Sequence, residues 1–358
     1  MKIITRYLYR QFFIYFFLSL ATFLIIYLVI EFFGKIDKFI EASVPLDITF
    51  LYFIYQSPFI ILQLIPVSVV ISVMLMLGLM NKHNEVLAMK CSGFSMYNIS
   101  YTLMGISVMI GIGAFFLSES IVPVTSSVSN RIWNSNVEKK NNRGSYKLSH
   151  IWYRGKKSIY QIRTYDKKSK IIEGITIFFF NKDFTLNKRI DARKAQWKNS
   201  GWCLNDGLIQ DLSINGGEKL KRFLTYNIQL PETPENFERS IKSPEEMSFW
   251  ELRKYTRKIK EEGYDSSQYR VDLNIKIAFP FICPVLTLVG IPIALRRRKG
   301  GIPFSISIGV GISFLYLLAL GLSRSLSVSG VLPPLLGAWM ANLLFSLFGI
   351  YLLFAEDR

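Results

Sequence analysis

The residues best suited to chemistry lie in a short polar segment between two long apolar stretches. Glu85 follows Asn84, a residue type that favours a helix N-cap, and a carboxylate is stabilised in the first turn of a helix. The pattern predicts an amphipathic helix over about residues 84–97. Such a helix either docks into a groove on a partner or only connects two membrane segments. The residues available for contact are Leu87, Ala88, Met89 and Gly93.

The sequence holds none of the short motifs that common catalytic mechanisms require. There is no GxxxxGKS/T nucleotide loop, no HExxH zinc motif, no GxSxG nucleophile elbow and no Cys/His pair. Cys91, Cys203 and Cys283 lie in different segments, and His83 and His150 have no metal-ligand spacing. We therefore expect no enzyme activity, cofactor or metal. If the protein does work, another subunit supplies the energy.

Six long apolar segments must position these residues. A hydrocarbon core of ~30 Å needs about 20 apolar residues per helix, and 50% of the 358 residues are hydrophobic. The first segment is too long for the apolar region of a secretory signal and has no cleavage site after it, so we expect it to stay as a helix. The six segments lie at 12–33, 50–79, 99–121, 273–295, 302–323 and 331–354.

Positively charged loops predict the orientation of these helices. Lys and Arg gather before the first segment, between the second and third, and between the fourth and fifth. Because such loops favour the cytoplasm, both termini are expected there and residues 122–270 on the opposite side. The residues concerned are Lys2, Arg6, Arg10, Lys82, Lys90, Arg296, Arg297, Arg298 and Lys299.

The region 122–270 predicts an inserted β domain. From Tyr146 onward apolar and polar residues alternate between turn signals, which favours an antiparallel sandwich or jelly roll. Its interior is either a filled core, the usual case, or an apolar slot. A helix is expected at about 245–262. The predicted interior residues are Ile159, Ile162, Ile175, Ile177, Phe179, Trp197, Trp202, Leu204, Leu208 and Leu212.

The expected fold class is therefore an α+β membrane protein with three helices on each side of the β domain. Residues 1–121 and 271–358 form the helical parts. The net charge is +17, and much of the excess lies in the β domain. Beyond a membrane, an anionic lipid or glycolipid is a better expected partner than nucleic acid, although a basic surface also keeps a domain soluble.

Four motifs spread over nearly the whole chain carry a resemblance to a known family. They are Arg6-Tyr7-Leu8, the segment Glu85 to Ser95, Pro280 with Gly290-Ile291-Pro292-Ile293-Ala294-Leu295-Arg296, and Leu332-Pro333-Pro334-Leu335-Leu336-Gly337-Ala338-Trp339. Together with the arrangement of three plus three helices, they resemble the lipopolysaccharide-export permeases LptF and LptG (YjgP/YjgQ). Asp37 and the Trp197/Trp202 pair make the chain look more like LptG.

The resemblance implies a location and a set of partners. The location is the inner membrane of a Gram-negative bacterium. An LptG-like chain pairs with a homologous six-span LptF-like chain above two copies of a cytoplasmic ATPase, LptB. The pair extracts lipopolysaccharide and passes it to LptC and then to the LptA bridge in the periplasm. The alternative is a mechanotransmitting or structural envelope membrane protein that moves no lipid.

The resemblance also implies residue roles. Glu85 would dock in the ATPase groove, with Leu87, Ala88, Met89 and Gly93 beside it. A lysine at the outer end of the first segment either pairs with a phosphate of lipopolysaccharide or snorkels to the interface. The candidates for phosphate binding are Lys35, Lys38 and Arg131. Charged residues near other segment ends are expected only to reach water. These residues are Glu31, Glu119 and Arg324.

Overall fold

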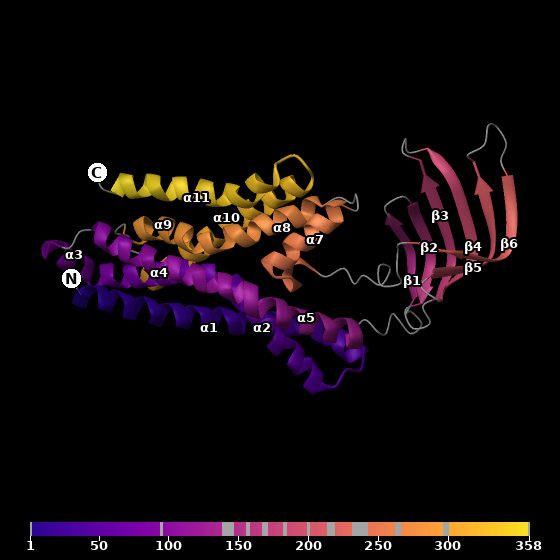
Figure 1. Ribbon diagram of the computed structural model, residues 1–358. Helices are drawn as coiled ribbons and strands as arrows, with labels where there is room; N and C mark the ends of the chain where they lie inside the picture. Colours follow the sequence, from indigo (N-terminus) through magenta and orange to yellow (C-terminus); the bar gives the residue numbers. More distant parts are fainter. Residues whose placement is uncertain are drawn as a thin grey trace. The chain divides into compact units, whose positions relative to one another are not determined.

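The computed structural model divides the chain into a helical unit and a β unit, each described by itself (Figure 1). The helical unit consists of Met1–Val137, Ser243–Arg257 and Asp265–Arg358, and the β unit of Glu138–Lys242 and Lys258–Tyr264. The predicted basic loop 296–299 and residues 94–95 lie outside the described residues. The structure describes residues 2–93, 96–137, 147–154, 158–166, 171–181, 185–198, 201–212, 219–230, 243–261, 266–295 and 301–356.

Among the described residues, six helices are long and apolar enough to cross a membrane, which confirms the prediction. They span Ile3–Glu41, Leu46–Lys82, Tyr97–Val137, Ser267–Leu295, Pro303–Val328 and Pro334–Ala355. Their elements are α1 (Lys2–Glu41), α2 (Leu46–Lys82), α4 (Met96–Phe116), η1 (Leu117–Ile121), α5 (Val122–Ile132), η2 (Trp133–Val137), α8 (Ser267–Ala278), η5 (Phe279–Phe281), α9 (Ile282–Leu295), α10 (Gly301–Val328) and α11 (Pro334–Glu356). Three shorter elements complete the helical set: α3 (Glu85–Cys91), η4 (Pro244–Glu246) and α7 (Phe249–Glu261).

The third long helix continues well beyond the predicted segment 99–121. It runs on through α5 and η2 to Val137, so residues 122–137 are helical, although the sequence pattern predicts a β domain from residue 122. Packing explains the extension, because α5 buries Val122 and Ser129 and lies against α2. Hydropathy alone did not reveal it, since the buried face of α5 contains serines as well as apolar residues.

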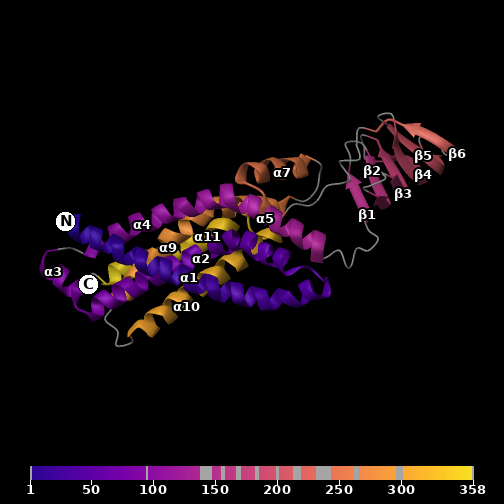
Figure 2. The ribbon, with the colours of Figure 1, turned by 90° about the horizontal axis from the view of Figure 1, so that it is seen from below.

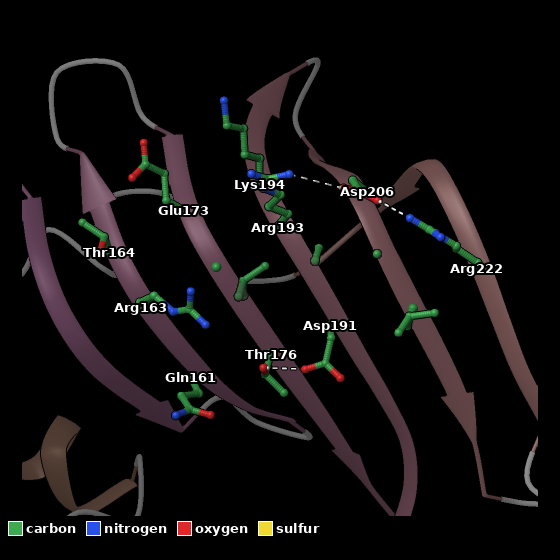
Figure 3. Close-up of a pocket in the computed structure, with 15 residues that line it drawn as sticks. Gln161, Arg163, Thr164, Glu173, Thr176, Asp191, Arg193, Lys194, Asp206 and Arg222 are labelled. Carbon is green, nitrogen blue, oxygen red and sulfur yellow. Dashed lines mark hydrogen bonds and ion pairs between the residues drawn. The ribbon is translucent and has the colours of Figure 1, made fainter.

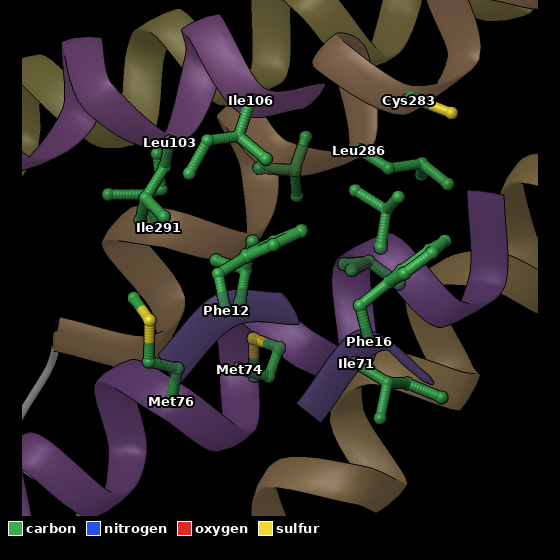
Figure 4. Close-up of a cluster of buried hydrophobic side chains, with 14 of the residues drawn as sticks. Phe12, Phe16, Ile71, Met74, Met76, Leu103, Ile106, Cys283, Leu286 and Ile291 are labelled. Carbon is green, nitrogen blue, oxygen red and sulfur yellow. The ribbon is translucent and has the colours of Figure 1, made fainter. Parts of the chain in front are cut away.

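A large apolar core packs most of the long helices of the described helical unit together (Figure 4). It draws Phe12 from α1, Met74 from α2, Leu103 from α4 and Leu286 from α9. In the 18-residue apolar stretch of each span, 72% of the residues are buried for the span with α2 and 67% for the span with α9, but only 11% for the span of α1. α1, α10 and α11 are therefore the spans with the most surface left for lipid or for another chain. Figure 2 shows α1 and α10 along the lower side of the bundle.

One close helix contact in this core depends on a glycine. A Cβ at Gly111 on α4 would overlap the carbonyl oxygen of Pro280 in η5. Small residues at such crossings let helix backbones approach closely, which favours association inside a membrane. The contact joins the first three long helices to the last three, on either side of the inserted β domain.

The described strands form a six-stranded antiparallel sheet in the order β1-β2-β3-β4-β5-β6. The predicted antiparallel sheet is thus confirmed, but its described strands follow one another as a meander rather than in the crossed connections of a jelly roll. The strands are β1 (Lys147–Arg154), β2 (Ser158–Asp166), β3 (Ile171–Phe180), β4 (Leu186–Lys198), β5 (Gly201–Asp211) and β6 (Lys219–Ile228).

The alternation of inward and outward side chains changes phase partway along several strands. On β5, Asp206 has a positive φ of 51°, and beyond it Ile209 is buried while Leu208 is 44% exposed. The prediction of Leu208 as an interior residue is therefore wrong, because a left-handed residue interrupts the period of two. On β2 it is Tyr160, rather than Ile159, that shares the buried face with Ile162.

Most of the other predicted interior positions agree with the structure. Five are buried, two are partly buried and pack against the buried cluster, and two are partly buried outside it. The buried residues are Ile162, Ile175, Ile177, Trp202 and Leu204, and the partly buried ones packed against them are Phe179 and Trp197. Ile159 and Leu212 are partly buried outside the cluster, so these two predictions do not agree with the structure. The five buried residues belong to one apolar cluster in the described part of the domain.

Candidate functional site

The connector between α2 and α4 carries the residues predicted to contact an ATPase. It folds as α3, a helix of seven residues. Val86 is buried in the helical core and Met89 packs against that core, whereas Leu87 and Ala88 are exposed. α3 is therefore attached to the bundle on one side and presents a small apolar surface on the other.

α3 is shorter than the predicted helix over residues 84–97. Asn84 has a φ of 56° and Gly93 a φ of 79°, so the backbone enters the left-handed region on both sides of α3. Glycine adopts this conformation without the penalty that a Cβ brings, and it commonly follows the end of a helix. Gly93 thus ends the connector helix instead of lying within it.

Glu85 contacts the first helix. The hydroxyl of Tyr7 on α1 donates a hydrogen bond to Oε2 of Glu85 at 2.9 Å. Local pattern did not predict this pair, because the two residues are 78 positions apart, but Tyr7 belongs to the Arg6-Tyr7-Leu8 motif. Among the described residues no hydrogen bond reaches Oε1 of Glu85, which leaves that oxygen for a donor on a partner.

Lys35 lies near the opposite end of α1, against α2. Its Nζ atom is 2.5 Å from Oε1 of Glu31 and donates a hydrogen bond to the hydroxyl of Tyr52 at 2.7 Å. The Lys35 side chain is 28% exposed and that of Glu31 19%. Glu31, expected only to reach water, is instead the counter-ion of Lys35.

Aromatic rings surround the two predicted lysines. The Nζ atom of Lys35 is 5.1 Å from the ring centre of Tyr52 and 5.3 Å from that of Trp133, and the Nζ atom of Lys38 is 5.6 Å from Trp133. Phe39 packs against both rings. Cations over aromatic faces are stabilised electrostatically. The sequence did not single out Tyr52 or Trp133, since α1, α2 and η2 meet only in the folded chain.

Arg131 does not join this cluster through any contact among the described residues. It is exposed on α5, two positions before Trp133. Side chains two positions apart on a helix point to nearly opposite sides, because each residue turns the chain by about 100°. Of the three predicted phosphate-binding residues, the structure brings Lys35 and Lys38 together and separates Arg131.

A second polar cluster attaches the start of α7 to the third long helix. The backbone N–H of Phe249 donates to both carboxylate oxygens of Glu119, at 2.8 and 2.9 Å. Lys276 on α8 lies 4.0 Å from the same carboxylate and donates to the carbonyl of Met247 at 2.6 Å. The side chains of Glu119 and Lys276 are only 15% and 14% exposed. Glu119 therefore holds the N-terminus of α7 and does not simply reach water.

Two further pairs lie in the same unit. Arg324 on α10 forms an ion pair with Asp272 on α8 at 2.8 Å, whereas its position near a segment end predicted only contact with water. Asn130 on α5 donates to Oε1 of Glu246 at 2.7 Å, and Glu246 closes a capping box with Ser243. These contacts attach η4 to the third long helix and join the span that contains α8 to α10.

The polar face of the β sheet carries a depression of about 1070 Å³ (Figure 3). Arg193 and Arg222 approach Asp206 to 4.0 and 3.5 Å, and Thr176 donates to Asp191 at 2.6 Å. Positive and negative groups alternate here and largely neutralise one another. The depression therefore has the chemistry of a mixed polar surface rather than of a strong anion site.

The described residues place charged, hydrogen-bonding and aromatic groups near the two ends of α1. No group of three or more His, Cys, Asp or Glu residues among them is placed to hold a metal ion. Cys91 is exposed, Cys203 half-buried and Cys283 buried, and all three are free thiols. What the fold positions instead is an exposed carboxylate-bearing helix at one end of α1 and a lysine–aromatic cluster at the other.

Comparison with known proteins agrees with the motif resemblance. Residues 6–354 match the family described as "Lipopolysaccharide export system permease LptF/LptG". The chain is 21% identical over 273 residues to "Lipopolysaccharide export system permease protein LptG" of Escherichia coli strain K12, a match that covers 74% of this chain and 73% of that protein. The protein of the same name from Escherichia coli O6:H1 matches with the same identity and coverage.

Proposed function

The chain belongs to the lipopolysaccharide export permease family LptF/LptG, and from this premise we propose that it is the LptG-type subunit of an ABC transporter that extracts lipopolysaccharide from the inner membrane. A homologous six-span chain completes the permease, and a cytoplasmic ATPase dimer drives it. LptC-like and LptA-like proteins receive the lipid in the periplasm. Both termini and α3 lie in the cytoplasm, and the β sheet lies in the periplasm.

The main support for a coupling role is that α3 packs against the helical core on one side and is exposed on the other. Val86 is buried in the same core as α1, α2, α4 and α9, while Leu87 and Ala88 are exposed. A movement of a partner bound to the exposed side would thus reach the core directly through closely packed side chains. Glu85 would pair with a basic group of the ATPase through its second carboxylate oxygen, and Tyr7 would hold the first.

Glu85→Ala tests this coupling. In proteoliposomes that contain the assembled transporter, we expect ATP hydrolysis to continue while lipopolysaccharide release falls about tenfold, as the loss of ~1.4 kcal/mol of coupling would produce. Glu41→Ala, which removes a carboxylate at the other end of α1, is the matched control and should leave both rates unchanged. Wild-type release by the Glu85 variant would exclude the role.

Lys35 and Lys38 are proposed to receive a phosphate of lipopolysaccharide. Lys35 is already paired with Glu31 at 2.5 Å, so an incoming phosphate has to displace that carboxylate. Displacement keeps the half-buried lysine paired at every stage, which avoids the cost of leaving a charge without a partner. Because Glu31 competes for Lys35, it delays binding of the phosphate and also favours the release of the phosphate afterwards. Arg131, exposed on α5, is a separate cation for a further phosphate of the same lipid.

Photocrosslinking to lipopolysaccharide separates this proposal from a mechanotransmitting protein that moves no lipid. With a photoreactive residue at position 32, we expect crosslinking in the native chain and a loss of several-fold when Lys35, Lys38 and Arg131 are replaced by Gln. Glu31→Gln should increase the crosslinked fraction, because the competing carboxylate is gone. Crosslinking that is absent in the native chain, or unchanged by all these substitutions, would refute the lipid site.

A further inference from the structure

α7 has one face packed on the helical unit and one face that is exposed. Leu252 and Thr256 are buried on the packed side. The opposite side carries an exposed row at helical spacing, which we call the basic stripe. The stripe consists of Trp250, Arg253, Lys254 and Arg257, all of which belong to the helical unit.

The composition of the basic stripe fits a phosphate-bearing lipid surface. Trp250 is 68% exposed, and the guanidinium of Arg253 lies 5.8 Å from the centre of its ring. No carboxylate of the described residues forms an ion pair with Arg253, Lys254 or Arg257, so all three cations are available there. Tryptophan is enriched at the headgroup level of membranes, and arginine and lysine bind phosphate.

The same composition is a poor match for a protein partner. The buried centres of protein interfaces are depleted of charge, and lysine is depleted across interfaces generally. The stripe offers a single aromatic side chain among three cations, and it lacks the apolar row that a docking helix would need.

The height of α7 along the bundle places the stripe near a membrane surface. At ~1.5 Å per residue, the helix from Met96 to Glu119 spans ~35 Å and the helix from Lys276 to Leu295 spans ~29 Å. Both lengths are close to the ~30 Å of a hydrocarbon core. Glu119 and Lys276 meet at the N-terminus of α7, and Figure 2 shows α7 outside the bundle beside the junction of α4 and α5.

We propose that the basic stripe binds the phosphate headgroups of anionic phospholipids in the outer leaflet of the membrane around the protein. Trp250 inserts among the headgroups, and Arg253, Lys254 and Arg257 each contact lipid phosphate. The attachment of α7 to Glu119 sets the height at which this happens. The assignment to the outer leaflet rests on the orientation proposed above, but phospholipid binding is measured without lipopolysaccharide export, so the two proposals can fail separately.

The test uses the full-length chain in nanodiscs of phosphatidylcholine with a minor fraction of spin-labelled phosphatidylglycerol or spin-labelled phosphatidylcholine. The fraction of motionally restricted label gives the preference of the protein for the anionic headgroup. We expect Lys254→Gln/Arg257→Gln to lower that preference at least threefold. Lys219→Gln/Lys221→Gln, which removes the same charge from exposed positions on β6, is the matched control and should change it little.

A second readout locates Trp250. Lipids brominated near the headgroup should quench less tryptophan fluorescence in Trp250→Phe than in the native chain, because the lipid-exposed indole is gone. Equal quenching in both proteins would overturn the proposal. So would an unchanged phosphatidylglycerol preference in Lys254→Gln/Arg257→Gln, or protection of Trp250 that arises only when a partner chain is added, since the stripe would then contact protein.

Discussion

Glu119 controls whether α7 stays attached to the membrane helices, and Glu119→Gln isolates its charge. Both carboxylate oxygens accept the N–H of Phe249 at the start of α7, and Lys276 lies 4.0 Å away. Glutamine has nearly the same shape and keeps an oxygen that can accept the same hydrogen bond. The substitution therefore removes the negative charge at the helix N-terminus with little loss of volume.

The expected magnitude follows from the burial of this carboxylate. An acidic group at a helix N-terminus contributes ~0.3–1 kcal/mol when exposed and up to ~2 kcal/mol when partly buried. Glu119 is 15% exposed, which favours the upper part of that range, and Lys276 loses its counter-ion as well. We expect α7 docking to weaken by ~1.5–2 kcal/mol, equivalent to a change of roughly 10- to 30-fold in the opening equilibrium.

Hydrogen–deuterium exchange of the purified chain in nanodiscs measures this opening directly. Amides at 252–257 should exchange about 10- to 30-fold faster in Glu119→Gln, because exchange reports the free energy of local opening. Glu245→Gln, an exposed carboxylate on η4, is the control and should leave these rates unchanged. A change of less than threefold, or an equal change in the control, would refute the assigned role of Glu119.

Three further substitutions test contacts at other places in the fold. Gly111→Ala should lower the thermal unfolding temperature of the helical unit by several degrees in detergent, since the new methyl group overlaps the Pro280 carbonyl; an unchanged temperature would argue against this crossing. Tyr7→Phe should reduce lipopolysaccharide release less than Glu85→Ala does, because it removes one hydrogen bond but keeps the Glu85 carboxylate. An equal loss of release would mean that Tyr7 itself contacts the ATPase. Gly207→Ala should destabilise the β sheet by ~1–3 kcal/mol in urea unfolding, because the alanine Cβ would overlap the backbone carbonyl of Asp191. A variant as stable as the native chain would contradict the packing described.

The local sequence pattern predicted the features that depend on a single helix or strand. Long runs of apolar residues predicted the six helices, and alternation predicted the antiparallel sheet. The segment around Glu85 stood out because N-cap, carboxylate and apolar residues lie within a few positions of one another. Motifs spread along the chain indicated the family over nearly its full length.

The partners of the charged residues depended on the tertiary structure. Glu119 bonds to the N–H of Phe249 at a separation of 130 positions, and the β domain lies between them in the sequence. Trp133 reaches Lys35 only because the third helix continues past its apolar segment. Local sequence shows that a charged residue in an apolar segment needs a partner, but it does not show which distant element supplies that partner.

The same distinction explains the errors within the sheet. Alternation predicted that β5 would have one buried face, but the left-handed Asp206 shifted that face from Leu208 to Ile209. The sequence by itself determined the elements, their order and the family, because hydropathy and local periodicity are properties of neighbouring residues. Only the tertiary structure decided the phase of the strands, the counter-ions of the buried charges and the composition of the lysine–aromatic cluster, because these depend on how distant segments pack together.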